Sequence, residues 1–386
     1  MNRTPDVLIV GGGPAGLAAA AQLARRGIAD VLVVDREGEA GGIPRFCPHP
    51  TFGVSDFFQP MSGPAYAARW RRRVDPAMIS CSTTVTRIGQ NGEVRAATRA
   101  GEIVLTPKRI LLATGIRERP RPARMISGDR PRNVLTTGAL QRLIAEGVAL
   151  PFRRPIIIGT EMVSFSATLS LRDHGVTPVA MLEADERIVT VGPGKLFAQM
   201  VLHAPVLCGH RLVSINAAPD DAAQLESVTV EAAGSRREIS CDAVIFTGDF
   251  VPEASLLAHC GKLLSTGSQG PAVDQHWRTA NPLIYAAGNV LRSVETAAWS
   301  AREGAAAADA IADDLGGTPA ARRIPIDLAG PIKLVVPSAL TLPVSSLGPL
   351  QMQVRMSRIA SGHFSLAADA REVWRSARLT LQRERR

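Results

Sequence analysis

Short apolar runs alternate with longer amphipathic segments along most of this chain. The run at 7–10 is uniformly apolar, an alanine- and leucine-rich segment at 14–26 ends at Gly27, and a second apolar run follows at 30–34. A strand that is buried on both faces has a continuous apolar sequence, and glycine commonly follows the last residue of a helix. The pattern therefore predicts a strand–helix–strand unit.

The same pattern recurs in the middle of the chain. An apolar strand is expected at 156–158, a helix at 162–174 and a further strand at 178–182. The two units are far apart in the sequence, so they indicate a duplication of fold rather than a short-period repeat.

The first strand runs directly into a glycine-rich turn. Gly11, Gly13 and Gly16 form G-x-G-x-x-G between the strand and the helix. In such a turn the first glycine allows the tight bend, the second lets the backbone approach a pyrophosphate, and the third permits close packing of helix and strand. The helix N-terminus then offers free N–H groups to the phosphates. Asp35 ends the second strand, where an acid accepts hydrogen bonds from ribose hydroxyls. This unit is predicted to bind a dinucleotide.

The second turn departs from this pattern. Its equivalent positions are Gly159, Glu161 and Ser164. A carboxylate at the middle position opposes a pyrophosphate both by its bulk and by its charge. NAD(P) binding is therefore doubtful. An empty pocket and a different nucleotide such as ATP both stay open. Glu183, at the end of the following strand, is either a ribose ligand or a solvated strand end.

The predicted fold class is α/β, with two Rossmann-like dinucleotide-binding domains and a small C-terminal β module. The first domain is discontinuous (1–148 and 272–320), the second is inserted at 149–271, and the module covers 321–386. Further predicted elements are an irregular loop at 37–64, a helix at 64–73, an antiparallel insertion at 78–105, a helix at 134–146, a hairpin at 227–240, strands at 243–247 and 282–288, a helix at 295–314, and module strands at 332–336, 351–356, 363–366 and 373–381.

Composition narrows the functional classes. The net charge of +9 comes from 44 basic residues, which are mostly arginines spread along the chain, and no nucleic-acid-binding motif accompanies them. We therefore expect a solvated arginine-rich surface and no nucleic-acid partner. No uncharged apolar stretch reaches about 18 residues, so no integral membrane segment is expected. The N-terminus lacks a signal-peptide pattern and the five cysteines form no C-x-x-C pair. A cytoplasmic location is expected.

Four segments resemble the FAD side of the two-dinucleotide-domain flavoprotein reductases, the pyridine nucleotide-disulfide oxidoreductases that include thioredoxin and glutathione reductases. They are 11–16, Gly41-Gly42, 113–115 and 285–289, and the resemblance extends from residue 5 to about 318. It implies FAD as the cofactor. In this family a carboxylate usually follows the last glycine, where this chain has the uncharged Asn289. The implied FAD contacts are Gly11, Gly13, Pro14, Ala15, Gly16, Asp35, Arg36, Gly42, Ala113, Thr114, Gly115, Gly288, Asn289, Glu295 and Thr296.

Three further segments, at 41–53, 163–166 and 289–300, are similar to the FAD-binding α subunits of heteromeric dye-linked amino-acid dehydrogenases. That group includes hydroxyproline, proline and opine dehydrogenases and hydrogen cyanide synthase. There a partner subunit of the D-amino-acid-oxidase type oxidises the substrate, and the FAD of the α subunit belongs to an electron relay, in some members with a small [2Fe–2S] protein. The resemblance implies a hetero-oligomer and a lost nicotinamide role, which agrees with Glu161.

The catalytic residues are unknown from the sequence. Arg45, Cys47 and His49 are weak candidates: Arg45 for stabilising a reduced flavin, Cys47 for redox or flavin contact, and His49 as a base. A structural role is the alternative for Cys47 and His49. No metal site is predicted, because Cys47 and His49 alone are too few ligands. No cysteine follows Cys260, so the ligands of any iron–sulfur cluster would lie on another polypeptide.

The predicted function is an FAD-dependent oxidoreductase, in which this chain relays electrons from a partner subunit to an acceptor. A self-contained NAD(P)H-dependent flavin reductase is the first alternative, and a flavin-bearing scaffold without turnover is the second. The C-terminal module is either a docking surface or a cap on the fold. Its arginines are Arg355, Arg358, Arg371, Arg375 and Arg378.

Overall fold

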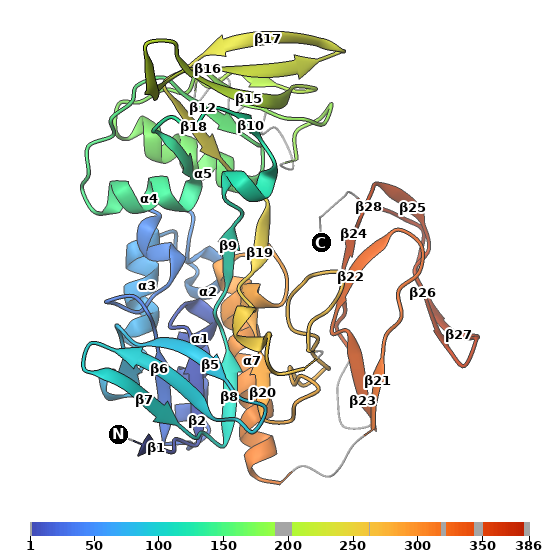
Figure 1. The fold of residues 1–386 in the computed structure, drawn as a ribbon. Helices are drawn as coiled ribbons and strands as arrows, with labels where there is room; N and C mark the ends of the chain where they lie inside the picture. The colour runs from blue at the N-terminus through green and yellow to red at the C-terminus, as the bar shows by residue number, and fades with distance from the viewer. Residues whose placement is uncertain (1, 190–202, 262, 318–321, 343–349, 382–386) are drawn as a thin grey trace. The chain divides into compact units, whose positions relative to one another are not determined.

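The computed structural model describes residues 2–189, 203–261, 263–317, 322–342 and 350–381 (Figure 1). Contacts within the chain divide it into two compact units. Unit 1 comprises 1–40, 70–116 and 251–386, and unit 2 comprises 41–69 and 117–250. The chain passes between the units after Ala40, within helix α3 (Gly63–Arg71), and within strands β9 (Ile116–Glu118) and β19 (Phe250–Pro252).

Unit 1 is built on a parallel sheet whose strand order is β20-β8-β2-β3-β4. Its strands β2 and β3 are buried at every position, as their continuous apolar sequences predict. A second sheet, in the order β1-β7-β6-β5, is the predicted insertion. The strands are β20 (Ile284–Ala286), β8 (Arg109–Leu112), β2 (Val7–Val10), β3 (Val31–Val34), β4 (Ile79–Ser80), β1 (Asn2–Arg3), β7 (Gly101–Leu105), β6 (Val94–Thr98) and β5 (Thr84–Ile88).

Two helices of unit 1 pack closely because their contact is made of small residues. Helix α1 (Pro14–Arg25) begins with proline, whose fixed φ suits the first turn. Helix α7 (Ala297–Leu315) crosses it at Gly304, where a Cβ would lie 2.0 Å from the carbonyl oxygen of Ala15. The backbones therefore approach to a distance that only glycine allows.

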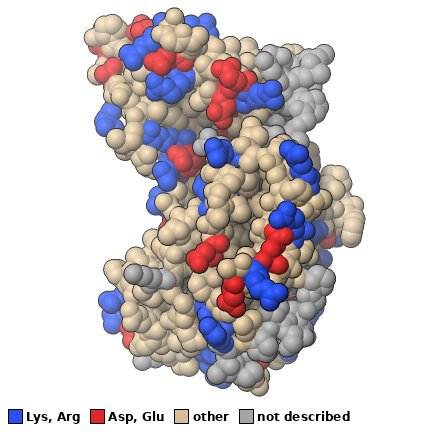
Figure 2. Space-filling model, turned by 90° about the vertical axis from the view of Figure 1, so that its right-hand side faces the viewer, with Lys and Arg blue, Asp and Glu red and all other residues tan. Residues whose placement is uncertain are grey.

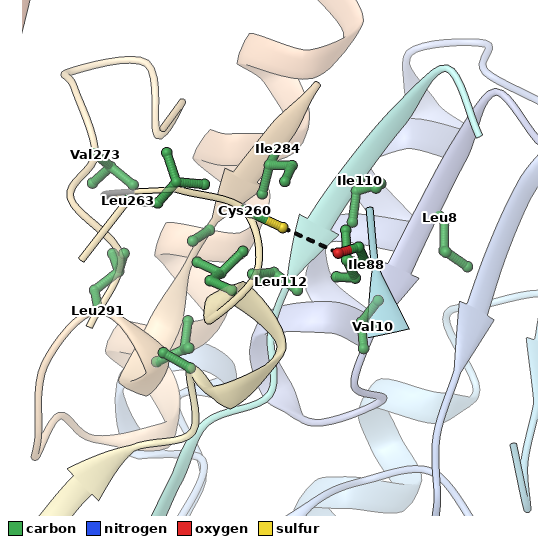
Figure 3. Close-up of a cluster of buried hydrophobic side chains, with 14 of the residues drawn as sticks. Leu8, Val10, Ile88, Ile110, Leu112, Cys260, Leu263, Val273, Ile284 and Leu291 are labelled. Carbon is green, nitrogen blue, oxygen red and sulfur yellow. Dashed lines mark hydrogen bonds between the residues drawn. The ribbon is translucent and has the colours of Figure 1, made fainter. Parts of the chain in front are cut away.

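The core of unit 1 joins side chains from distant parts of the sequence (Figure 3). Leu8, Ile110 and Ile284 come from the sheet, and Leu263 and Leu291 come from the C-terminal part of the chain. The Cys260 thiol donates a hydrogen bond to the carbonyl oxygen of Ile88 at 3.2 Å. Burial raises the pKa of Cys260, so this cysteine is an uncharged core residue. The short 3-10 helices of unit 1 are η2 (Pro76–Met78), η4 (Ser255–Leu257) and η5 (Gly288–Val290).

Unit 2 has a parallel sheet in the order β11-β18-β12-β13-β14. Alternate residues of this sheet enter two different cores: Ile157 packs with helix residues Leu140 and Phe165, and Ile156 packs with Leu212 and Val228 of an antiparallel sheet. The elements are β11 (Val134–Thr136), β18 (Ala243–Phe246), β12 (Pro155–Ile158), β13 (Ala180–Leu182), β14 (Val206–Leu207), β10 (Ser127–Gly128), β15 (Arg211–Ala218), β16 (Asp221–Ala232), β17 (Ser235–Ser240), α2 (Val54–Phe57), α4 (Thr137–Ala145), α5 (Met162–Arg172), η1 (Ile43–Phe46) and η3 (Arg121–Arg124).

The C-terminal module consists of paired antiparallel strands, as predicted. β21 pairs with β23, β22 with β24, β25 with β28, and β26 with β27. The strands are β21 (Arg322–Pro325), β22 (Ile332–Val336), β23 (Ala339–Leu342), β24 (Gln353–Met356), β25 (Ala360–Gly362), β26 (Ser365–Ala368), β27 (Arg371–Arg375) and β28 (Leu379–Leu381).

The α/β class is confirmed, and three local predictions are wrong. Residues 134–136 form strand β11 before helix α4, because they pair in parallel with β18. The single strand expected at 373–381 is two strands, β27 and β28, with different partners. The loop expected at 37–64 contains the short helices η1 and α2. Tertiary pairing overrides local preference at the first two of these places.

Candidate dinucleotide-binding sites

The first glycine turn has the geometry of a phosphate cradle. Gly11 has φ +107°, and a Cβ there would lie 2.5 Å from the carbonyl oxygen of Ala113. A Cβ on Gly16 would lie 1.9 Å from the carbonyl oxygen of Gly11. Gly13 is the N-cap of α1 and carries no side chain over the free N–H groups of the first turn. The positive end of the helix dipole is therefore open to an anion.

This turn lies where the order of the sheet reverses. Strand β2 pairs with β3 on one side, which the chain reaches through α1, and with β8 on the other. Ligands of doubly wound sheets bind at the carboxyl ends of such strands. Ala113, Thr114 and Gly115 follow β8 at this end, and the Thr114 hydroxyl donates to the carbonyl oxygen of Glu253 at 2.7 Å.

Asp35 orders the turn from the end of β3. Its carboxylate accepts hydrogen bonds from the backbone N–H of Gly12 at 2.7 Å and of Glu37 at 2.9 Å. Burial raises the pKa of Asp35, and these two hydrogen bonds oppose that rise. A ribose contact of Asp35 stays a prediction. Its neighbour Arg36 is largely exposed and lies 3.8 Å from the Glu37 carboxylate.

The segment after β20 is held by its own side chains. The Asn289 amide accepts from the Glu295 backbone N–H at 2.7 Å and donates to the Glu295 carbonyl oxygen at 3.2 Å. Thr296 caps α7 by accepting from the backbone N–H of Trp299 at 3.2 Å. The Asn289 and Thr296 side chains thus shape the loop that carries Gly288, whereas the sequence predicted that they contact FAD. Those contacts stay predictions.

A buried ion cluster supports this loop. Glu303 on α7 accepts from the backbone N–H of Gly288 at 3.0 Å and pairs with Arg292, which has 0% exposure. Burial raises the pKa of Glu303, while the charge of Arg292 lowers it. The Glu295 carboxylate pairs with Arg355 of β24 and lies 3.7 Å from Arg292.

Sequence reasoning missed Arg292 and Glu303. One signal was present for Glu303. It lies on the same helix face as Ala307 and Ile311, and a charged residue on a face that is otherwise apolar and buried is unusual.

These features fit FAD. Gly11, Gly13 and Gly16, with 113–115 and 288–289, would hold its phosphates and flavin end, and Asp35 lies at the strand end where a ribose is expected. The fit rests on two observations. A Cβ at Gly11 or Gly16 would clash with the backbone, and no side chain caps the N-terminus of α1.

The second turn differs because it contains its own anion. The Glu161 carboxylate accepts hydrogen bonds from the hydroxyls of Ser164 at 3.1 Å and Thr247 at 3.0 Å. A Cβ on Gly159 would lie 2.4 Å from this carboxylate, and one on Gly248 would lie 2.2 Å from it. These residues follow β12 and β18, where the order of the second sheet reverses. Glu161 therefore occupies the position in which phosphates approach the backbone.

An arginine binds the backbone segment that faces this carboxylate. Arg124 donates to the carbonyl oxygens of Thr247 at 3.0 Å and Gly248 at 2.8 Å, and its guanidinium lies 5.0 Å from the ring centre of Phe246. Burial lowers the pKa of Arg124, and nearby carboxylates that include Glu161 oppose this. Glu183 accepts from the Thr160 hydroxyl and from the Asp185 backbone at 3.1 Å. The polar side chains around the second turn thus bind one another and nearby backbone groups.

Cys47 and His49 lie together in unit 2. The Cys47 thiol donates to Gln141 Oε1 at 3.5 Å, Gln141 Nε2 donates to Ser166 Oγ at 2.8 Å, and His49 Nε2 lies 2.5 Å from the same oxygen. Burial raises the pKa of Cys47 to about 12, so its reactive thiolate is scarce at neutral pH. The cluster attaches the loop after β3 to helices α4 and α5, which favours a structural role for both residues.

The other predicted residues of this segment also belong to unit 2. The Arg45 guanidinium lies 5.1 Å from the ring centre of Phe46. Gly42, with φ +65°, is the N-cap of η1. The glycine turn and residues 113–115 and 288–296 belong to unit 1, so the predicted site residues divide between the units.

Three general features can be read from the described parts of the chain. They contain no group of three His, Cys, Asp or Glu side chains that could hold a metal ion. None of their helices is long and apolar enough to span a bilayer. On the face drawn in Figure 2, basic and acidic side chains are interspersed.

Comparison with known proteins places this chain in a family. The model of the pyridine nucleotide-disulphide oxidoreductases matches residues 5–304. An opine oxidase subunit of Agrobacterium tumefaciens (strain Ach5) is 28% identical over 319 residues, which are 74% of this chain and 61% of that protein. Hydrogen cyanide synthase subunit HcnB of Pseudomonas aeruginosa is 32% identical over 198 residues, which are 48% of this chain and 39% of that protein. This chain therefore matches less than two thirds of the length of these relatives.

The solved structure of thioredoxin reductase from T. acidophilum has the same fold. Its TM-score is 0.68 at 21% identity, over 82% of this chain and 100% of that one. The chain belongs to the pyridine nucleotide-disulphide oxidoreductase family. It is a flavoprotein of this family with the two-Rossmann-domain fold, as its sequence predicted.

Proposed function

We propose that this chain is the FAD-bearing subunit of a heteromeric amino-acid or opine-type dehydrogenase, and that it relays electrons from a partner subunit to an acceptor. The observation that carries the proposal is the Glu161 carboxylate at the second turn, hydrogen-bonded to Ser164 and Thr247. It opposes the phosphates of a nicotinamide dinucleotide, the usual reductant in this family. The sequence also lacks a C-x-x-C pair, through which the related reductases transfer electrons.

The names of two relatives support a subunit role, since both are subunits of larger enzymes. We infer a partner of the D-amino-acid-oxidase type, a small [2Fe–2S] protein as a further member of the relay, and a cytoplasmic location. We keep the domain bounds 1–148 with 272–320, 149–271 and 321–386, and the FAD contacts named above, as part of this proposal.

In the proposed reaction the partner oxidises an amine to an imine, and its own redox cofactor takes up two electrons and two protons. FAD held at the first glycine turn would supply two-electron redox chemistry, so that the two electrons pass from the partner to an acceptor and the two protons leave to water. The residues of this chain bind and orient the cofactor. Asp35 fixes the Gly12 backbone, and Glu303 fixes that of Gly288. Glu161 blocks reduction by a nicotinamide.

Anaerobic mixing with NADH or NADPH tests the proposal. We expect the visible absorbance of the oxidised flavin to persist, because the second turn does not accept the dinucleotide. Dithionite is the control, since it must bleach the same sample. Rapid bleaching by either nucleotide would establish the self-contained flavin reductase instead.

The scaffold alternative needs a separate experiment with the complete complex. Gly11→Val removes the flavin by placing a side chain against Ala113. If this chain is part of the relay, a complex that contains the variant loses electron transfer to an artificial acceptor. Full activity without flavin in this subunit would show that the chain is a scaffold.

A further inference from the structure

The C-terminal module divides into two parts with different surroundings. In the first part, 322–356, Leu334 and Val336 enter the core of unit 1. The Thr341 hydroxyl donates to Asp274 Oδ2 at 2.6 Å, and Arg355 pairs with Glu295. In the second part, 357–381, no residue is buried. The first part is thus a cap on the cofactor-binding unit, and the second part, which we call the terminal hairpins, has no core of its own.

The terminal hairpins expose large apolar side chains. Trp374 is 55% exposed and Val373 is 59% exposed, both on β27. Trp374 lies opposite Leu366, whereas Val373 occupies an irregularity in the strand register and has no cross-strand partner in that pairing. Ile359 is 59% and Leu379 42% exposed. Isolated two-stranded hairpins are marginally stable in water, so such a segment gains stability when another surface covers it.

The charge of this surface indicates what covers it. The terminal hairpins contain four arginines and two acidic residues. Arg375 already forms two hydrogen bonds of 2.8 Å with Glu372, which leaves Arg358, Arg371 and Arg378 with the single acid Asp369, a net charge of +2. Trp and Arg are the residue types that contribute most to binding energy at protein interfaces. An acidic protein surface complements this combination of an apolar centre and basic neighbours.

We propose that the terminal hairpins, residues 357–381, are the docking surface for the partner subunit, an acidic protein that covers Trp374 and Val373 and pairs with the surrounding arginines. This inference rests on the proposed function. The surface is continuous with the cofactor-binding unit, because β24 immediately precedes it and Arg355 of β24 pairs with Glu295 in the loop after Gly288. Docking here attaches the partner to the same compact unit that contains the first glycine turn.

The test uses the full-length chain with the partner subunit that co-purifies with it from its own host, each then purified separately. Trp374→Ser with Val373→Ser removes the apolar centre, and Arg371→Glu with Arg378→Glu reverses the charge. Leu328→Ser is the matched control, since Leu328 is a 40% exposed apolar residue of the first part of the module. We expect each double variant to raise the dissociation constant for the partner by about tenfold or more, and the control to leave it unchanged. Flavin content should stay at the wild-type level in all of them.

A second measurement locates the contact. A photo-cross-linking amino acid at position 374 should attach to an acidic segment of the partner, and acid-to-lysine changes in that segment should restore binding to the Arg371→Glu, Arg378→Glu variant. Attachment to a second copy of this chain, or undiminished partner binding by both double variants, would overturn the docking surface while leaving the electron relay intact. A wild-type chain that purifies alone would overturn the surface as well. The nicotinamide-reduction experiment reports on the proposed function independently.

Discussion

Glu161 shows how one side chain changes the use of a shared backbone geometry. The backbone around it keeps the Rossmann form, with Gly159 at φ +122° and helix α5 beginning at Met162. The carboxylate fills the turn because two hydroxyls, of Ser164 and Thr247, donate to it. The sequence indicated a conflict with phosphate, and the structure adds the hydrogen-bond partners that hold the carboxylate in place.

Glu161→Gly should open the second turn to a dinucleotide. Without the side chain, Gly159 and Gly248 no longer face a carboxylate, and we expect the affinity for NADH to rise by about tenfold or more, equivalent to about 1.4 kcal/mol. Isothermal titration of NADH into the FAD-loaded protein measures this. Glu161→Gln is the matched control, because it removes the charge and retains the bulk. If the glycine variant binds NADH no better than wild type, a residue other than Glu161 prevents binding.

His49 should make stability depend on pH. Burial lowers its pKa below the ordinary 6.5, while Asp173 opposes the shift. The folded chain therefore holds neutral His49 over a range where the unfolded chain already binds a proton, so this contribution to stability is present above pH 6.5 and is lost as the pH falls through the lowered pKa. We expect wild type to lose stability relative to His49→Gln as the pH falls below about 6.5 in denaturant titrations. Parallel pH profiles of the two proteins would contradict the neutral state.

At the scale of elements, the contact between α1 and α7 positions the cofactor turn. Both helices begin next to predicted FAD contacts, α1 at Pro14 and α7 after Thr296. Their small residues let the backbones meet at Ala15 and Gly304. A larger residue at this crossing separates the helices and so moves the glycine turn.

Gly304→Ala should therefore weaken both stability and flavin binding. The new methyl group would lie 2.0 Å from the carbonyl oxygen of Ala15, and overpacking of this kind costs about 1–3 kcal/mol. Thermal unfolding and the ratio of flavin to protein absorbance measure the two effects. Gly38→Ala is the matched control in the same unit, because a Cβ there meets no atom within 4 Å. An unchanged flavin content in Gly304→Ala would show that the turn tolerates movement of the helices.

At the scale of the whole molecule, predictions from the sequence succeeded where local pattern and fold coincide. The strand at 7–10 and the helix from Pro14 were predicted at or near their bounds. Strand β11 was missed because its three residues form a strand only through pairing with β18, far later in the chain, where Val134 lies opposite Val244. The sequence left two roles open for the C-terminal module, a cap on the fold and a docking surface. The structure divides the module into a buried part and an exposed part. Leu334 belongs to the core, whereas Trp374 is exposed.

The sequence by itself determined the class of this protein, because phosphate-binding turns need glycines at fixed spacing and buried parallel strands need continuous apolar runs. It also located the altered residue of the second turn. Only the tertiary structure decided what each polar side chain contacts. Glu161 meets Thr247, and Glu303 meets Gly288 and Arg292. These partners come from separate strands, helices and loops that packing brings together. The sequence pattern marks Glu303 as a polar residue on an apolar helix face, but it does not show which groups either carboxylate contacts.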